Sequence, residues 1–225
     1  SSFSEIRYFT TTNVFGYGKT EDVPYGYTFR LTGGIQQLEY SQRHYMGGSV
    51  AYANTTRRGG YAFGTLDAGG YVSQGHIDDG VARLKAFYLS PILKAGRYKF
   101  RHFIFGQSTL GINRSELDSI SLNGEWGIRD FKSDYTYGQS RIAVKAETVA
   151  FTPWYFYGFR FALFGFFDAG FISNHHSFSN SEMFSGFGLG LRLGNEHLAI
   201  QNIQLRVGFY PLAPKDERFM QWRLN

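Results

Sequence analysis

The chain has 225 residues, no cysteine and a formal net charge of +5 at pH 7. This length suits one domain with a sizeable core and excludes a small scaffold held together by disulfides. Aromatic residues make up 19% of the chain and charged residues only 18%, which excludes a highly charged disordered tail. The Lys and Arg residues are scattered and form no basic run, so the charge pattern does not indicate a nucleic-acid partner.

A membrane-spanning helix is not expected either. The longest apolar stretch, Phe161–Phe167, is far shorter than the roughly 18 residues that such a helix needs. The chain does not open with a basic segment followed by an apolar one, so no signal peptide is visible, and Ser1 begins either a mature protein or a fragment.

Alternation of apolar and polar residues, which is typical of strands, predicts ten strands and the start of another. In chain order they are Ser4–Gly16, Tyr27–Tyr40, Tyr45–Thr55, Tyr61–Ser73, Val81–Ile92, Arg97–Leu110, Arg141–Phe151, Phe159–Phe171, Ser185–Leu193 and Ile203–Phe209, with Phe219–Leu224 beginning one more. Most are longer than the five or six residues usual in soluble proteins. Their length is close to the roughly 9 to 11 residues with which a tilted strand crosses a bilayer.

The two faces of these strands differ in chemistry. In Phe159–Phe171 the odd positions are apolar or small, and the even ones include Asp168. In Arg141–Phe151 the polar positions include Lys145 and Glu147. Outer-membrane strands alternate lipid-facing apolar with lumen-facing polar side chains, so we expect Glu147 and Asp168 to face a lumen.

The connections and the strand ends agree with a transmembrane meander. Short turns are expected at residues 56–60, 94–97 and 194–197, and longer polar loops at residues 74–80, 111–139, 174–183 and 212–218. Trp154, Tyr155 and Tyr157 are typical of an aromatic girdle at the membrane interface. The sequence therefore predicts an all-β, antiparallel transmembrane β-barrel. A soluble meander, such as a lipocalin-like barrel or a sandwich, alternates in the same way and stays open as the alternative.

Three motifs carry a resemblance to a known family. The long segment 111–139 contains Ile128-Arg129-Asp130-Phe131. The next strand contains Glu147 followed by Thr152-Pro153, which is expected to be a turn, and the strand after it contains Phe166-Phe167-Asp168-Ala169-Gly170. Over about residues 122–210 this resembles the outer-membrane protein assembly factor superfamily, the BamA and TamA type of bacterial surface antigen. In that family the long loop carries a (Val/Ile)-Arg-Gly-(Phe/Tyr) signature and folds back into the lumen. Asp130 stands where the family has glycine.

The resemblance implies an anchored loop, in which Arg129, flanked by Ile128 and Phe131, binds Glu147 and Asp168 on the barrel wall. A guanidinium suits this role because its fixed donors match carboxylates. The family's barrels have sixteen strands, so residues 1–225 are expected to be one outer-membrane barrel domain that is incomplete at both ends.

The same resemblance implies a protein of a bacterial or organelle outer membrane, not an enzyme, that inserts other polypeptides into the membrane or translocates them across it. Its partners would be the lipid bilayer, client polypeptides or barrel precursors, and periplasmic accessory subunits, with no cofactor, metal or nucleic acid. Two rivals stay open: a barrel that anchors an appended enzyme domain, and a passive pore or adhesin.

Other candidate chemistry is weaker. Adjacent His175 and His176 point apart in a strand or loop, so a metal site is not expected there. No helix follows the glycine-rich run 186–190, which argues against a phosphate loop and for small residues facing a crowded lumen. His102 falls on the lipid-facing register and has no evident serine partner for a catalytic dyad.

Overall fold

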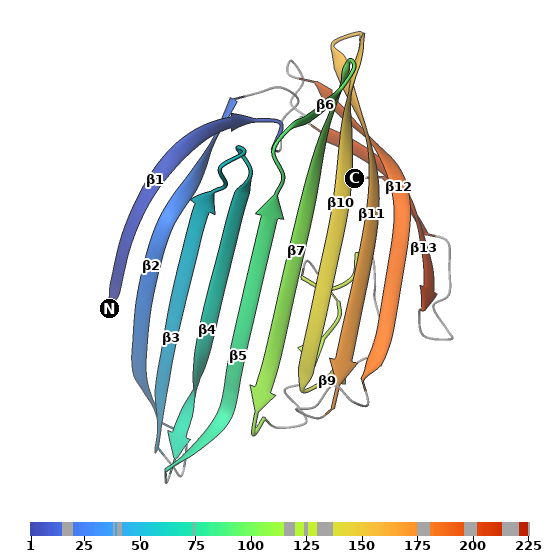
Figure 1. Ribbon diagram of the computed structural model, residues 1–225. Helices are drawn as coiled ribbons and strands as arrows, with labels where there is room; N and C mark the ends of the chain where they lie inside the picture. The colour runs from blue at the N-terminus through green and yellow to red at the C-terminus, as the bar shows by residue number, and fades with distance from the viewer. Residues whose placement is uncertain are drawn as a thin grey trace.

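The computed structural model describes residues 1–14, 20–37, 39, 42–73, 75–114, 120–123, 126–129, 137–174, 181–195, 202–212 and 221–224. Over these residues the protein is all-β, and its strands form one large antiparallel meander that curls strongly (Figure 1). Within the same ranges no helix is long and apolar enough to cross a membrane.

The main sheet follows the order of the chain. Its strands are β1 (Ser2–Thr12), β2 (Thr20–Gln37), β3 (Gln42–Thr55), β4 (Tyr61–Ser73), β5 (His76–Leu89), β7 (Tyr98–Ile112), β10 (Ser140–Phe156), β11 (Phe159–Ser173), β12 (Glu182–Asn195), β13 (Asn202–Leu212) and β14 (Gln221–Leu224). The short β6 (Leu93–Ala95) pairs with β7, while β8 (Ile120–Ser121) and β9 (Tyr137–Gly138) form a separate pair. This confirms the predicted all-β class and the meander of ten strands with a short additional one. In the described part of the chain, β1 and β14 end the sheet and do not pair with each other.

The predicted alternation is also confirmed in the burial of side chains. In β11 the even positions Phe164, Phe166 and Asp168 are buried, whereas Leu163 and Phe167 are 44% and 47% exposed. The pattern extends across the sheet, because each neighbouring strand presents large apolar side chains to the outside; examples are Met46, Leu66, Leu84, Ile104, Val144, Leu189 and Val207. The convex face is therefore a broad apolar surface.

A hydrophobic cluster fills one end of the concave face. It joins buried residues from strands that are not neighbours in the sheet, including Tyr61 of β4, Phe103 of β7 and Phe164 of β11. Phe9 of β1 packs against this cluster, with its ring centroid 5.8 Å from that of Tyr61. Such contacts require the strong curl of the sheet, and they lie towards the end where β1 arches over the other strands (Figure 1).

Arg101 of β7 fastens the end of β1 to the same region. Its side chain is fully buried and donates to the carbonyl of Thr12, to Thr11 Oγ1 at 3.2 Å and to the carbonyl of Ser90 at 3.2 Å. Because β1 and β7 are separated by four strands in the sheet, these bonds cross the concave side.

Three local predictions were wrong. The expected loop 74–80 is mostly strand, since β5 begins at His76, and β2 begins at Thr20 rather than Tyr27. Thr152-Pro153 is not a turn: it lies in β10 where the register with β11 shifts between Phe151 and Tyr155. Proline lacks the amide hydrogen of a ladder bond, so a bulge accommodates it. The actual turn is Tyr157-Gly158, with φ of 47° and 80°, as expected of a two-residue hairpin loop.

Candidate functional site

Between β7 and β10, the described residues 120–123 and 126–129 lie against the concave face of the sheet. The short strands β8 and β9 pair with each other, with Ile120 opposite Gly138. The Arg141 side chain of β10 donates to the carbonyl of Ser121 and so ties this hairpin to the wall. Beyond β8, Leu122 and Ile128 are almost fully buried and belong to a small apolar cluster with Ala143, Ile172, Phe184 and Tyr210.

Gly127 permits the tight course of the chain in this loop. The amide of Ile128 donates to the carbonyl of Leu122 at 3.1 Å. A Cβ added at Gly127 would lie 1.6 Å from that carbonyl oxygen, so no other residue fits the observed backbone. The resulting turn places Arg129 directly against the wall.

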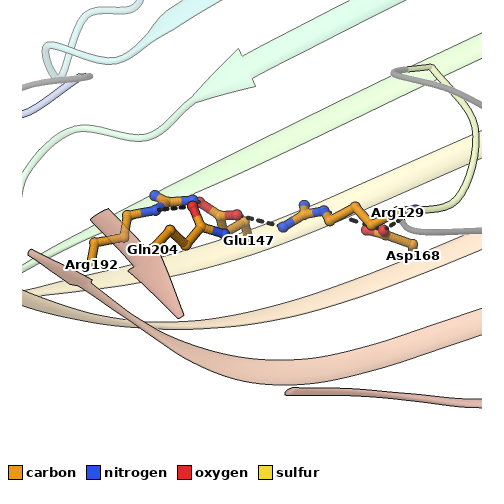
Figure 2. Close-up of polar contacts among 5 residues, drawn as sticks. All are labelled: Arg129, Glu147, Asp168, Arg192 and Gln204. Atoms are coloured by element: carbon orange, nitrogen blue, oxygen red, sulfur yellow. Dashed lines mark hydrogen bonds and ion pairs between the residues drawn. The ribbon is translucent and has the colours of Figure 1, made fainter. Parts of the chain in front are cut away.

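Arg129 is held by two carboxylates of neighbouring strands (Figure 2). Its Nη1 lies 2.5 Å from Oε2 of Glu147 on β10, and its Nε lies 3.2 Å from Oδ2 of Asp168 on β11. The backbone amide of Arg129 also donates to Asp168 Oδ2 at 3.0 Å. The side chains of Arg129, Glu147 and Asp168 are 13%, 9% and 0% exposed, so these pairs are shielded from water.

The register of β10 and β11 explains why the two carboxylates converge. Glu147 lies opposite Phe166, and Lys145 lies opposite Asp168. All four side chains therefore point to the concave face, and Glu147 and Asp168 are diagonal neighbours, which long side chains can bridge. The guanidinium of Arg129 spans this diagonal and lies 4.8 Å from the centre of the Phe166 ring.

A second arginine extends the network towards β13. Arg192 of β12 contacts Glu147 Oε1 at 2.7 Å and donates from Nε to Oε1 of Gln204 at 3.1 Å. Glu147 thus lies between two arginines, as Figure 2 shows. Arg192 also stacks on Phe164, with 4.4 Å between the guanidinium carbon and the ring centre.

Gly170, which lies two residues after Asp168 on β11, leaves space for the loop. A Cβ added there would lie 2.8 Å from Leu122 Cδ2 and 3.2 Å from Ile128 Cδ1. Other glycines leave space for aromatic rings in the same way: the Phe164 and Phe166 rings lie directly over Gly190 and Gly188 of β12. The glycine run 186–190 therefore accommodates aromatic rings from neighbouring strands, as expected for small residues on a crowded concave face.

The structure brings together the arginine and the two carboxylates of the expected loop anchor. Arg129 contacts Glu147 and Asp168, and Ile128 lies beside it in the apolar cluster, although neither a lumen nor a membrane follows from these contacts. Phe131 and Asp130 lie outside the described residues, as do His175 and His176. The aromatic residues Trp154, Tyr155 and Tyr157 are 50%, 63% and 84% exposed at the hairpin end of β10.

Sequence analysis did not assign Arg192 and Gln204 to the site. Both occupy the polar register of their strands, so alternation placed them on the correct face. Alternation could not supply the strand register, which sets Arg192 opposite Gln204 and brings Arg192 to Glu147. His102 has a polar neighbour that was not foreseen, since its Nδ1 lies 2.8 Å from Thr148 Oγ1 on the adjacent strand.

Comparison with known proteins gives no independent assignment. The chain matches none of the protein-family descriptions, curated proteins or solved structures with which it was compared. The chemistry of the site therefore follows from its geometry. It is a buried, hydrogen-bonded ion-pair network that fixes a loop against two strands, and such a network suits an anchor.

Proposed function

We propose that this chain forms part of an outer-membrane β-barrel of the assembly-factor type, which inserts polypeptides into the membrane or translocates them across it. The observation that carries the proposal is the anchoring of the loop by Arg129 on Glu147 and Asp168. These three residues come from the motifs in which the sequence resembles that superfamily.

The outward face of the sheet supports the membrane part of the proposal. Neighbouring strands place large apolar side chains side by side on it, as in the pairs Phe167 with Phe187 and Phe187 with Phe209. Each of these three is between 47% and 49% exposed. Soluble monomers rarely expose a continuous apolar surface of this extent, whereas a bilayer would cover it.

The loop gives the proposal its mechanism. A barrel that admits another strand has to open a seam, and backbone groups exposed at that seam are penalised in lipid until they pair. A loop fixed to β10 and β11 keeps this part of the wall in register while pairing changes elsewhere. The ion pairs are well suited to that role because they join the loop to two adjacent strands.

The experiment uses the full-length protein reconstituted in phospholipid vesicles. We expect it to accelerate the insertion of an unfolded outer-membrane barrel precursor. Insertion is measured by gel electrophoresis, in which the folded barrel migrates differently from the unfolded precursor. An Arg129→Ala variant should remain inserted but lose most of the acceleration. Arg57→Ala, which changes an exposed arginine in the β3–β4 turn, is the matched control and should behave like wild type.

Two results would contradict the proposal. Wild-type vesicles that insert the precursor no faster than empty vesicles would remove the insertion function. Equal acceleration by wild type and by a correctly inserted Arg129→Ala variant would show that the anchored loop has no part in it.

A further inference from the structure

A cleft of about 440 Å³ lies at the hairpin end of the sheet, where β7 and β10 separate. The ladder between these strands ends at the pair of Lys99 with Phe151, and the irregular stretch 152–154 of β10 follows directly. The β6–β7 and β10–β11 hairpins continue beyond this point at the rim of the sheet (Figure 1). Neither Arg129 nor its carboxylate partners line the cleft, so it is separate from the loop anchor.

The hairpin on one side of the cleft is basic. Arg97 and Lys99 line the cleft, and Lys94 lies directly opposite Lys99 in the β6–β7 ladder. Like charges in such a position repel each other. All three side chains are exposed, and none of them forms an ion pair within the described part of the chain. A bound anion would relieve the repulsion.

Acidic residues are absent from the chain segments that contribute to the cleft. These segments, in which the sequence has no aspartate or glutamate, are residues 6–19, 89–101 and 148–167. Glu21 of β2 accepts from the amide of Val14 at 2.7 Å and does not line the cleft. Arg160 also lines the cleft but takes part in further interactions, and the positive charge of the cleft rests on Arg97 and Lys99 without it.

A buried amide provides an independent indication of a ligand. Asn13, which follows β1, lines the cleft and is only 3% exposed. Its Oδ1 accepts no hydrogen bond from the residues that the structure describes. A buried acceptor left in this state costs free energy, and a hydroxyl group of a ligand would satisfy it.

Aromatic side chains complete the cleft. Trp154 and Tyr155 line it, and the ring of Tyr98 meets that of Trp154 with 6.5 Å between their centroids. Exposed rings of this kind are typical of a membrane interface, where basic side chains attract anionic lipid headgroups. If the apolar face of the sheet lies in lipid, this rim lies at the depth of the headgroups.

We propose that the cleft binds the headgroup of an anionic phospholipid in which hydroxyl groups accompany the phosphate, as in phosphatidylglycerol. The phosphate would contact Arg97 and Lys99, whose charged groups donate to its oxygens, and a hydroxyl would donate to Asn13 Oδ1. The inference rests on the membrane location in the proposed function, and it does not depend on the movement of polypeptides.

The test uses native mass spectrometry of the full-length protein, released from detergent micelles that contain one phospholipid at a time. Phosphatidylglycerol is compared with phosphatidylmethanol, which keeps the charge but lacks the hydroxyls, and with phosphatidylcholine, which has no net charge. We expect phosphatidylglycerol to bind at least about tenfold more tightly than phosphatidylcholine and about threefold more tightly than phosphatidylmethanol. Asn13→Gly, which suits the φ of 60° at this position, should bind the two anionic lipids equally.

Variants locate the site. Arg97→Gln/Lys99→Gln should weaken the binding of phosphatidylglycerol at least about tenfold. Arg57→Gln/Arg58→Gln, which removes two exposed charges from the β3–β4 turn at the same end of the sheet, should leave it unchanged. Equal binding of the three lipids by wild type, or unchanged binding by the folded Arg97→Gln/Lys99→Gln variant, would overturn the proposal.

Two further measurements separate this proposal from its rivals. Glycerophosphoglycerol, the same headgroup without acyl chains, should compete only weakly, and competition as strong as that of the lipid would overturn the lipid assignment in favour of a soluble phosphate ester. Flotation with vesicles distinguishes the site from the membrane location. A wild-type protein that floats but has no preference for phosphatidylglycerol loses this site alone, whereas one that does not float loses the membrane location as well.

Discussion

Arg129 takes part in two ion pairs at once, and both partners are buried. Removing it would leave Asp168 without its guanidinium, while Glu147 would keep its ion pair with Arg192. Deleting one partner of a buried pair is costly because the remaining charge is neither solvated nor compensated. Arg129 therefore matters for stability mainly because its loss would leave buried negative charge without a partner.

We expect Arg129→Ala to lower the free energy of unfolding by about 3 kcal/mol. Denaturant titration of the protein in detergent measures this, with Arg57→Ala as the control. Exposed Arg57 should change stability by less than about 0.5 kcal/mol. Indistinguishable titrations for the two variants would show that the buried ion pairs add no net stability.

Gly127 offers a sharper test of the loop conformation. Gly127→Ala places a methyl group on the carbonyl of Leu122, whereas a Cβ at Gly106 meets no heavy atom within 4 Å. Hydrogen exchange at the amides of Ile128 and Arg129 should therefore become faster in Gly127→Ala and stay the same in Gly106→Ala. Unchanged protection in Gly127→Ala would mean that the loop is held differently.

Much of this site could be predicted at the level of single residues. Alternation alone put Glu147 and Asp168 on one face, and the family resemblance added Arg129. Arg192 and Gln204 could not be assigned, because the contacts of Arg192 with Glu147 and with Gln204 depend on the relative shift of β10, β12 and β13. That shift is set by turn geometry and side-chain packing, which a single sequence shows only indirectly.

At the scale of the elements, β1 is held by contacts outside its own strand pair. It is an edge strand in the described part of the chain, and Arg101 fastens its last residues across the concave side. Exposed edge strands are free to fray or to pair with other chains. The buried arginine therefore has a structural role that its neighbours on β7 do not share.

Arg101→Met should loosen this end of β1. It removes donors to oxygens of the partly buried Thr11 and Thr12 and the buried Ser90, and each buried polar group left unsatisfied costs about 1 to 3 kcal/mol. We expect hydrogen exchange near Thr12 to become faster, with little change near Ser4. Arg7→Met is the control, because Arg7 is exposed and its ion pair with Glu5 lies on the surface. Equal exchange at Thr12 in both variants would rule out the fastening role.

The elements also show where sequence patterns are sufficient. The bounds of β4 were predicted as the structure has them, because alternation stops at both ends of Tyr61–Ser73. The start of β5 was missed because His76 to Gly80 is polar and resembles a loop. Its pairing with β4 nevertheless continues through a bulge, from Gly69 opposite Val81 to Tyr71 opposite Asp78. Polar strand ends of this kind show little of the hydrophobic alternation that identifies a strand.

At the scale of the whole molecule, the sheet has an apolar outside and a mixed inside. The alternation in the sequence predicted the apolar face, but it did not predict that Phe164 and Phe166 would join the polar face and fill the concave side at one end. Whether that apolar face contacts lipid or water decides the class of protein, and charged substitutions distinguish the two.

We expect Leu189→Arg to be costly if this face lies in lipid. Leu189 is 73% exposed in the middle of β12, and an arginine near the bilayer midplane costs about 2 to 4 kcal/mol. Leu212→Arg, at the end of β13, should cost at most about 1 kcal/mol because it lies near an interface. In a water-soluble sheet both substitutions would change the free energy of unfolding by less than about 0.5 kcal/mol.

The central claim is that this sheet lies in a membrane with its apolar face towards lipid and its anchored loop inside. The chain has no cysteine, so single cysteines at successive positions of β11, from Ala162 to Phe167, can each carry a spin label in the full-length protein in vesicles. Collision rates with oxygen and with a water-soluble nickel complex then report the surroundings of each label. We expect labels at 163, 165 and 167 to collide preferentially with oxygen, and those at 162, 164 and 166 not to do so. Preferential collision of the nickel complex with labels at 163, 165 and 167 would contradict it.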